Sequence, residues 1–281
     1  DGIRDSSTSR GLGDVYKRLR IFIRYITCET LRVFYSLVYL RKDMADRWAD
    51  SHRRDAWRKM AKNSGYRARS AFKLLQIQER FGVIRKGDLV LDVGAHPGGW
   101  SQVSVECVGE KGKVVGVDLE PCEPIEFCTF IVGDITEDET QEKVIEAFSG
   151  SMINSIVSDI SPNLTGNWSM DQIISLQLVA SVFDFSLPLL CPGGNFVTKV
   201  FQGEGIENLI NLIKPYFSSV KRYSPDASRN SSSEVYLVCK NHLPWKNSKT
   251  SILSNLNSFY KDDGEERTEK AAMGFRLHKA K

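Results

Sequence analysis

The sequence predicts an α/β protein built around a mostly parallel sheet. An apolar run near residue 90 passes into a glycine-rich loop and then into a helical pattern, further apolar runs alternate with helical patterns, and an acid follows each of three successive apolar runs. A strand that is apolar on both faces is typical of a parallel sheet covered on both sides. A strand, a glycine loop and a helix together begin a Rossmann-like unit.

Length and composition indicate one substantial folded core. The chain has 281 residues, of which 41% are apolar and 26% are charged, and this excludes a short disulfide scaffold and a mostly disordered chain. Its six cysteines form no C-x-x-C pair, and none of its four histidines pair at metal-ligand spacing. We therefore expect reduced thiols, a cytoplasmic location and no metal site.

Positive charge is concentrated in one segment. Residues 41–86 carry 14 Lys and Arg against 5 Asp and Glu, a net charge of +9, although the whole chain carries only +3. Trp48, Trp57 and Tyr66 are interleaved with these cations, and aromatic rings can stack on bases while Arg and Lys bind phosphates. A solvated charged helix is the alternative. The candidate nucleic-acid contacts are Arg53, Arg54, Arg58, Lys59, Arg67 and Arg69.

The two ends of the chain look less ordered than its middle. Residues 17–41 are rich in apolar side chains, but the longest uncharged stretch, 33–40, is far shorter than the ~20 residues that a bilayer-spanning helix needs. We therefore expect no membrane contact. We expect an N-terminal extension over residues 1–43 that is dispensable or loosely attached, a main domain over 44–240, and a polar, charged tail over 241–281.

Apolar periodicity places the elements of the main domain. Pro192-Gly193-Gly194 is expected to stop its longest helix, and the short link before the last strand favours an antiparallel hairpin at the sheet edge. The prediction is a seven-stranded, mostly parallel sheet with an antiparallel last strand. We expect helices at 69–81, 101–108, 170–190 and 206–216, and strands at 87–94, 113–117, 127–132, 154–158, 195–200, 219–223 and 234–240.

The glycine loop and the strand-end acids indicate a ligand site. The loop at 94–100 fails the dinucleotide pattern G-x-G-x-x-G, because His96 stands two residues after Gly94. Asp92, Asp118 and Asp134 each stand at the carboxyl end of a predicted strand, where open α/β sheets bind ligands. Capping or turn chemistry explains any one of these acids equally well. Three in succession favour a ligand.

Lys199 stands inside an otherwise apolar strand and therefore needs carboxylate neighbours, because burying an ammonium group without partners is costly. Asp159 on the preceding strand and Glu234 on the last strand are the candidates. A structural ion pair is the default explanation for one buried lysine. Two lysines and two acids beside a ligand loop favour catalysis.

Five motifs resemble the FtsJ/RrmJ family of S-adenosylmethionine-dependent RNA ribose 2′-O-methyltransferases, in unbroken order over residues 64–240. They are YRARSAFKL at 66–74, GAHPGGWSQV at 94–103, SDISPN at 158–163, VTKVFQGEG at 197–205, and PDASR at 225–229 with SEVY at 233–236. The resemblance implies the methyltransferase form of the Rossmann-like fold. It also implies a catalytic tetrad, which falls on Lys73, Asp159, Lys199 and Glu234.

The resemblance further implies S-adenosylmethionine as the cofactor. Its contacts would fall on Gly94, Gly98, Trp100, Asp118, Asp134 and Asp159. His96 departs from the family, which usually has a small residue there, so it either narrows the cofactor loop or contacts the methionine group.

Two other functional classes remain open, a nicotinamide-dependent oxidoreductase and an RNA-binding protein without catalysis. The wrong glycine spacing disfavours the first, and the tetrad disfavours both. Within the family, the short single-domain form favours a uridine of large-subunit ribosomal RNA as the target, and the anticodon loop of tRNA is the alternative. We expect the enzyme to act as a monomer.

Overall fold

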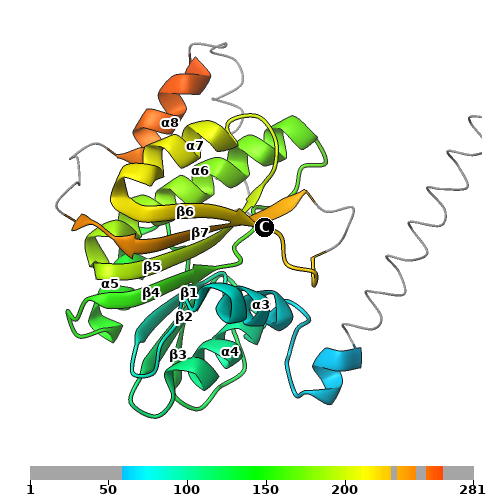
Figure 1. Cartoon of the computed structure of the whole chain (residues 1–281), viewed down its shortest axis with the longest axis vertical. Coiled ribbons are helices and arrows are strands. Elements are labelled where there is room, and N and C mark those ends of the chain that lie inside the picture. The colour runs from blue at the N-terminus through cyan, green and yellow to red at the C-terminus, as the bar shows by residue number, and fades with distance from the viewer. Residues whose placement is uncertain (1–58, 229–232, 245–250, 262–281) are drawn as a thin grey trace, which may run out of the picture. The chain divides into compact units, whose positions relative to one another are not determined.

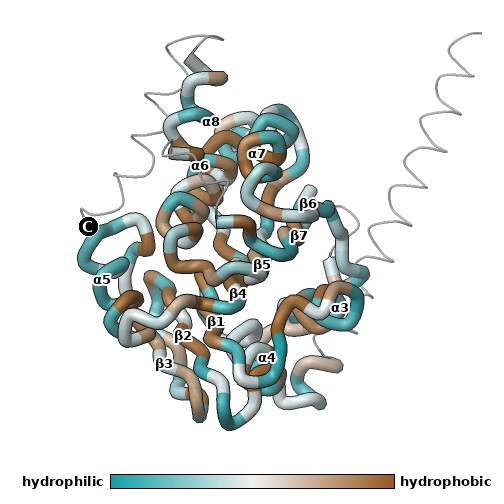
Figure 2. The backbone as a smooth tube through the Cα atoms, turned by 60° about the vertical axis from the view of Figure 1, so that its left-hand side comes forward, coloured by the Kyte–Doolittle hydropathy of each residue, from teal (hydrophilic) through white to brown (hydrophobic). Residues whose placement is uncertain are grey.

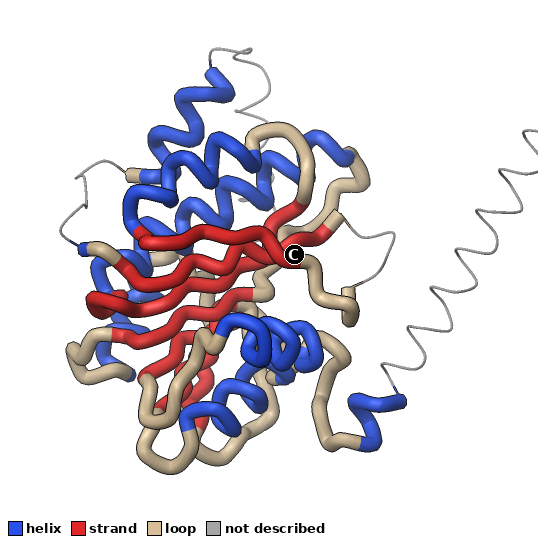
Figure 3. Tube along the Cα trace, in the orientation of Figure 1, coloured by secondary structure: helices blue, strands red, loops and turns tan. Residues whose placement is uncertain are grey.

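The computed structural model describes residues 59–228, 233–244 and 251–261, and in this part of the chain a seven-stranded sheet forms the centre of the fold (Figures 1 and 3). The strand order is β3-β2-β1-β4-β5-β7-β6, with β1 to β5 parallel and β7 antiparallel to both β5 and β6. The predicted mostly parallel sheet with an antiparallel last strand is therefore confirmed. The strands are β1 Leu89–Val93, β2 Lys113–Asp118, β3 Cys128–Val132, β4 Ile153–Ser158, β5 Leu190–Phe201, β6 Phe217–Tyr223 and β7 Glu234–His242.

Helices cover both faces of this sheet (Figure 1). One face carries α3 and α4, and the other carries α5 to α8. The strands alternate their side chains between the two layers, so that Val90 of β1 packs with α3 and α4 while Leu91 and Val93 pack with α6. The helices are α3 Ala71–Phe81, α4 Gly99–Val108, α5 Asp138–Ala147, α6 Trp168–Ser186, α7 Ile206–Ile213 and α8 Ile252–Lys261.

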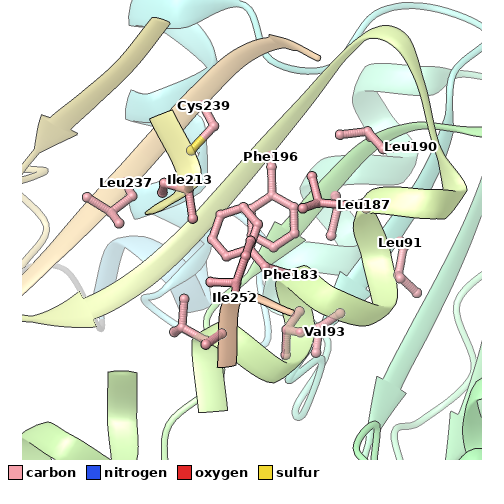
Figure 4. Close-up of a cluster of buried hydrophobic side chains, with 14 of the residues drawn as sticks. Leu91, Val93, Phe183, Leu187, Leu190, Phe196, Ile213, Leu237, Cys239 and Ile252 are labelled. Carbon is pink, nitrogen blue, oxygen red and sulfur yellow. The ribbon is translucent and has the colours of Figure 1, made fainter. Parts of the chain in front are cut away.

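The larger core lies between the sheet and α6. Phe183 of α6 stacks on Phe196 of β5, with ring centroids 4.0 Å apart and planes 17° apart (Figure 4). The hydrophobic colouring in Figure 2 follows the central strands and this helix. The segment Trp168–Leu189 is long and apolar enough to cross a membrane, but 67% of its apolar stretch is buried inside the fold. Its composition is thus that of a core helix.

The structure corrects the predicted end of the longest helix. The α-helix stops at Ser186, a short 3-10 turn covers Leu187–Leu189, and β5 already begins at Leu190. Pro188 explains the early stop, because proline has no N–H to donate and its ring clashes with the preceding turn of a helix. Pro192-Gly193-Gly194 therefore lie within the span of β5, near an irregularity in its pairing with β4.

Two helices were not anticipated. α5 has only Thr140 and Val144 buried among its ten residues, so its apolar pattern is weak. α8 lies in the stretch expected to be a polar tail, yet Ile252 and Leu256 belong to the larger core. Asp184 of α6 caps the start of α8 by accepting hydrogen bonds from Ser251 Oγ (2.6 Å) and the backbone N–H groups of residues 252 and 253.

The N-terminal extension at 1–43 and the basic segment as far as Arg58 lie outside the described residues. Residues 59–63 of the basic segment are helical, and a turn follows at Ser64-Gly65.

One carboxyl group is fully buried among the described strands. Asp92 of β1 has no exposed surface, and its Oδ2 accepts a hydrogen bond from Ser101 Oγ at 2.6 Å. Its Oδ1 has no hydrogen-bond partner within the fold. Burial, reinforced by the carboxylates of Asp159 and Asp118, raises the pKa of Asp92 to about 7.

The raised pKa of Asp92 predicts a loss of stability with rising pH. Between about pH 4 and pH 7 the folded protein holds a proton that the unfolded chain releases, so the free energy of unfolding falls across that window. Asp92→Asn removes this dependence. Its stability relative to the parent should rise between pH 5 and pH 8 by several kcal/mol, measured by urea unfolding. Glu79→Gln, at an exposed acid of α3, is the control; equal pH slopes for the parent and Asp92→Asn would refute the explanation.

Candidate active site

Asp159 and Lys199 meet at the carboxyl end of the sheet. Ser158, the last residue of β4, pairs in register with Thr198 of β5, so the next residues along, Asp159 and Lys199, lie beside one another. Lys199 Nζ is 3.3 Å from Asp159 Oδ1 and 2.8 Å from the Asp159 carbonyl oxygen. Asp159 is thus the carboxylate neighbour that the sequence predicted for Lys199.

The second lysine comes from α3. Its neighbours on this helix, Ala71 and Leu74, are apolar and fully buried. Lys73 lies on the same buried side, and only 6% of its surface is exposed. Lys73 Nζ is 3.2 Å from Glu234 Oε2 and 3.9 Å from Asp159 Oδ1. The structure therefore brings all four predicted catalytic residues together. We call them the lysine–carboxylate cluster: Lys73, Asp159, Lys199 and Glu234.

Tyr236 is a fifth member of this site that the sequence analysis did not assign. It stands opposite Lys199 in the β5–β7 pairing, and its hydroxyl donates a hydrogen bond to Asp159 Oδ1 at 2.6 Å. Burial, and then the adjacent Asp159 carboxylate, raises the pKa of Tyr236 well above its usual range. The phenol therefore keeps its proton and acts as a donor. Its position two residues after Glu234, on the same face of β7, is the signal that could have identified it.

Two positions of the loop after β1 have no room for a side chain. Gly94 has φ +80°, and a Cβ there would lie 2.7 Å from the Cα of Ile160. Gly98 has φ +108°, and a Cβ there would lie 2.8 Å from the guanidinium of Arg67. Only glycine fits at both positions. The loop ends at the N-terminus of α4, whose first N–H groups have no partners within the helix.

Two strand-end acids are held with their carboxylates oriented. Asp118 accepts hydrogen bonds from the backbone N–H groups of His96 (2.9 Å) and Glu120 (3.0 Å), one at each oxygen. Asp134 accepts from the N–H and the hydroxyl of Thr136 through Oδ1. Because a carboxylate has about four lone-pair sites, both acids can still accept hydrogen bonds from a ligand.

His96 connects two loops at the carboxyl edge of the sheet. Its peptide bond to Pro97 is cis, and its Nδ1 lies 3.1 Å from the carbonyl oxygen of Pro121, beyond β2. His96 therefore joins the loop after β1 to the loop after β2, and both roles considered for it, narrowing the cofactor loop and contacting the methionine group, stay predictions.

Two residues with predicted ligand contacts turn out to support the fold. Trp100 is 2% exposed, its indole N–H donates to the carbonyl of Ser70 at 2.8 Å, and its ring packs 5.6 Å from that of Tyr236. The side chain of Trp100 would have to leave this packing to contact the cofactor. The predicted contact between Trp100 and the cofactor is therefore assigned to its backbone N–H.

Arg67 was predicted to bind RNA, but its guanidinium is already engaged. It donates to the backbone carbonyls of Glu123 (2.6 Å), Pro124 (2.8 Å) and Pro97 (3.4 Å). The backbone N–H of Arg67 also donates to the side chain of Gln102 in α4, at 2.9 Å. Arg67 therefore holds the cofactor loop and the loop after β2 together.

Of the remaining predicted RNA contacts, two are among the described residues and three are not. Arg69 lies close enough to Tyr236 to act on its pKa, and with Lys62 it lines a surface hollow of about 420 Å³. Lys59 is exposed and is the first described residue of the basic segment. Arg53, Arg54 and Arg58 lie outside the described residues.

Metal ligands do not gather in the described part of the chain. No group of three His, Cys, Asp or Glu side chains there is placed to hold an ion, and the five cysteines in those ranges are free thiols.

Comparison with known proteins identifies the family. Residues 66–242 match the model of the FtsJ-like methyltransferases. A protein of Methanocaldococcus jannaschii named ribosomal RNA large subunit methyltransferase E is 39% identical over 229 residues, covering 80% of this chain and 93% of that protein. An Archaeoglobus fulgidus protein of the same name is 48% identical over 188 residues, covering 67% and 96%.

A solved structure agrees with these relatives. A Plasmodium falciparum protein, whose crystal structure carries the provisional name ribosomal RNA methyltransferase, is 32% identical. It superposes with a TM-score of 0.58 over 63% of this chain and 99% of its own. The match to the family model spans every strand of the sheet and all four residues of the lysine–carboxylate cluster. The chain therefore belongs to the FtsJ-like methyltransferase family, whose methyl donor is S-adenosylmethionine.

Proposed function

We propose that this enzyme methylates the 2′-hydroxyl of a ribose in large-subunit ribosomal RNA, at a uridine, and that it acts in the cytoplasm as a monomer. The observation that carries the proposal is the lysine–carboxylate cluster, held at the end of the sheet next to a glycine loop. The names of the relatives from Methanocaldococcus jannaschii and Archaeoglobus fulgidus support the choice of RNA.

The residues around the glycine loop fit S-adenosylmethionine. The cofactor supplies a methyl group already activated on a sulfonium. Gly94 and Gly98 give the loop its positive-φ conformation against Ile160 and Arg67, and the N-terminus of α4 offers backbone N–H donors. Asp118 would hold the ribose hydroxyls of the cofactor, because its carboxylate is already oriented by two backbone N–H groups. Asp134 and Asp159 would complete the contacts with its polar groups.

Lys199 is the group we assign to the substrate hydroxyl. In its ammonium form it has three N–H donors, and Asp159 accepts two of them, at Oδ1 and at the carbonyl oxygen. One donor remains to bind the 2′-oxygen and stabilise the negative charge that develops there. As a neutral amine the same nitrogen would instead take the hydroxyl proton as a general base.

The other members of the site keep Lys199 in place. Asp159 Oδ1 is shared between Lys199 and the hydroxyl of Tyr236, with Lys73 at 3.9 Å. Glu234 balances the charge of Lys73. The two acids thus compensate two buried cations, and a reaction that needs an aligned hydroxyl gains from this rigidity.

RNA binding is assigned to the basic segment. Arg53, Arg54, Arg58 and Lys59 would contact phosphates, and Arg69 would do so beside the cluster, because the charge of 41–86 is opposite to that of RNA.

A transfer assay tests the proposed function. The protein, a labelled methyl donor, and either large-subunit ribosomal RNA or tRNA are incubated, and the 2′-O-methylated positions are mapped. We expect label at a uridine of the ribosomal RNA. Label confined to the tRNA anticodon loop would replace the proposal with its alternative, and label in neither would reject both.

Removing Lys199 should separate chemistry from cofactor binding. Lys199→Ala should lower the rate of methyl transfer by about 10²–10⁴-fold and leave the Kd for S-adenosylmethionine unchanged. Lys199→Arg keeps a cation that cannot lose its proton, so partial activity in that variant would indicate charge stabilisation rather than base catalysis. Lys143→Ala, at an exposed lysine of α5, is the control. Near-normal transfer by Lys199→Ala would remove this residue from the mechanism.

Asp118 should act on the cofactor alone. Asp118→Asn keeps the size of the side chain but loses its charge, and we expect calorimetry to show weaker S-adenosylmethionine binding by about 1.5–3 kcal/mol. The affinity for RNA should not change. Glu120→Gln, two residues further on and exposed, should bind the cofactor like the parent. Unchanged cofactor affinity in Asp118→Asn would show that this acid only holds the loop.

A further inference from the structure

Two large apolar side chains are exposed in the segment that follows Asp159. Leu164 is 64% exposed and Trp168 is 52% exposed, and both follow Asp159 along the chain, in the loop before α6 and in its first turn. A single exposed apolar residue is ordinary on a protein surface. Two of them four residues apart, close in sequence to a buried charged site, indicate a surface that another molecule covers.

Contacts through Phe201 link Trp168 to the site. Phe201 lies two residues after Lys199 on the same face of β5, a separation of roughly 7 Å, and it stands opposite Glu234 in the pairing with β7. The Trp168 ring lies 6.1 Å from that of Phe201, at 45°. Phe201 itself is only 6% exposed. Trp168 therefore rests on a buried ring that adjoins two members of the cluster, and about half of its own surface stays free.

The loop that carries these side chains is fixed from within. Asp171 of α6 is 5% exposed, and its carboxylate accepts hydrogen bonds from the N–H (2.6 Å) and hydroxyl (2.7 Å) of Thr165 and from the N–H of Gly166 (3.2 Å). Asn167 caps α6 by accepting from the N–H of Met170 at 3.4 Å. A preformed loop of this kind loses little conformational entropy when a ligand binds.

We propose that Trp168 is a stacking platform for an unpaired base of the RNA, next to the target ribose or one nucleotide further along the strand. The proposal rests on the proposed function, because it assumes that a ribose lies at Lys199. The bases of a single strand are free to stack on aromatic side chains, and an indole gives the largest such surface. Leu164 would pack against the edge of the same base.

Stacking explains why a tryptophan suits this position without selecting the target. Every base has a flat aromatic face, so this contact adds affinity and register but does not choose uridine. The base would be held while the 2′-hydroxyl of its neighbour lies at Lys199.

A cycle that combines protein and RNA variants tests this inference. The parent, Trp168→Ala and Trp168→Phe are compared on one ribosomal RNA fragment and on copies that each carry a single abasic nucleotide near the target. Methyl transfer gives KM and kcat, and fluorescence anisotropy gives the affinity for each fragment. Phe259→Ala, at an exposed aromatic residue of α8, is the matched control.

Trp168→Ala should raise the KM for the intact fragment by about 5-fold to 150-fold, with little change in kcat and none in cofactor affinity. Trp168→Phe should recover part of the loss, and Phe259→Ala should behave like the parent. At one abasic position the parent should bind as weakly as Trp168→Ala, because the partner of the indole is then missing.

Three results would overturn the inference. One is equal KM values for the parent and Trp168→Ala. Another is a defect that persists unchanged on every abasic fragment, since Trp168 would then support the protein rather than a base. Self-association that Trp168→Ala abolishes would assign the patch to a second copy of the chain, and would reject the inference as well. If the parent transfers no methyl group, the proposed function fails by itself, and the anisotropy comparison still decides whether Trp168 stacks on RNA.

Discussion

The site depends on one carboxylate that serves two buried cations. Asp159 Oδ1 lies within ion-pair distance of both Lys199 and Lys73, and it also accepts the hydrogen bond from Tyr236. An ammonium group in a protein interior is tolerated only with such partners. Three elements, α3, β5 and β7, therefore converge on the end of β4, and the antiparallel placement of β7 beside β5 is what puts Tyr236 opposite Lys199.

Different strands contribute different parts of the site at the carboxyl edge of the sheet. β1, β2 and β3 are followed by the glycine loop, Asp118 and Asp134, which together suit a small polar ligand. β5, β7 and α3 contribute the lysines and Glu234, which suit a hydroxyl that must lose its proton. β4 lies between the two groups of strands, and Asp159 at its end faces the second group while its charge reaches Asp92 in β1. A methyl donor and a methyl acceptor would meet at that border.

Most of the sheet could be predicted from the sequence, because a strand buried on both faces is a continuous apolar run with few alternative structures. A lysine inside such a run demands acids nearby, and this predicted Asp159 beside Lys199. Lys73 was expected only from the resemblance to the family, and Glu234, the second predicted neighbour of Lys199, pairs with Lys73. What sequence reasoning missed depends on three-dimensional contacts. α5 has almost no apolar face, α8 is recognisable only from its packing against α6, and the early end of α6 follows from Pro188, whose effect was overlooked in favour of the stronger Pro-Gly-Gly signal.

The roles of single side chains within the motifs also depend on three-dimensional contacts. The conspicuous Trp100 and Arg67 were predicted to contact ligands, yet one packs in the core and the other binds backbone carbonyls. Their side-chain types fit either role, and only the direction in which each side chain points separates the two. The spacing of Tyr236 from Glu234 places both on one face of the strand, but the position of Tyr236 opposite Lys199 depends on the register between β5 and β7, which a strand pattern does not reveal.

The hydrogen bonds of Arg67 also connect the loops around the proposed cofactor site to the segment that carries Lys73. Its guanidinium holds the loops around Gly98 and Glu123, and Arg67 itself lies six residues before Lys73, on the segment that leads into α3. Any ligand that orders those loops also orders the segment that delivers Lys73. Thermodynamic linkage then makes the effect mutual, so that loading of the methyl donor and assembly of the acceptor site favour each other. Bound methyl donor would then raise the affinity for RNA, and bound RNA would raise the affinity for the donor by the same factor.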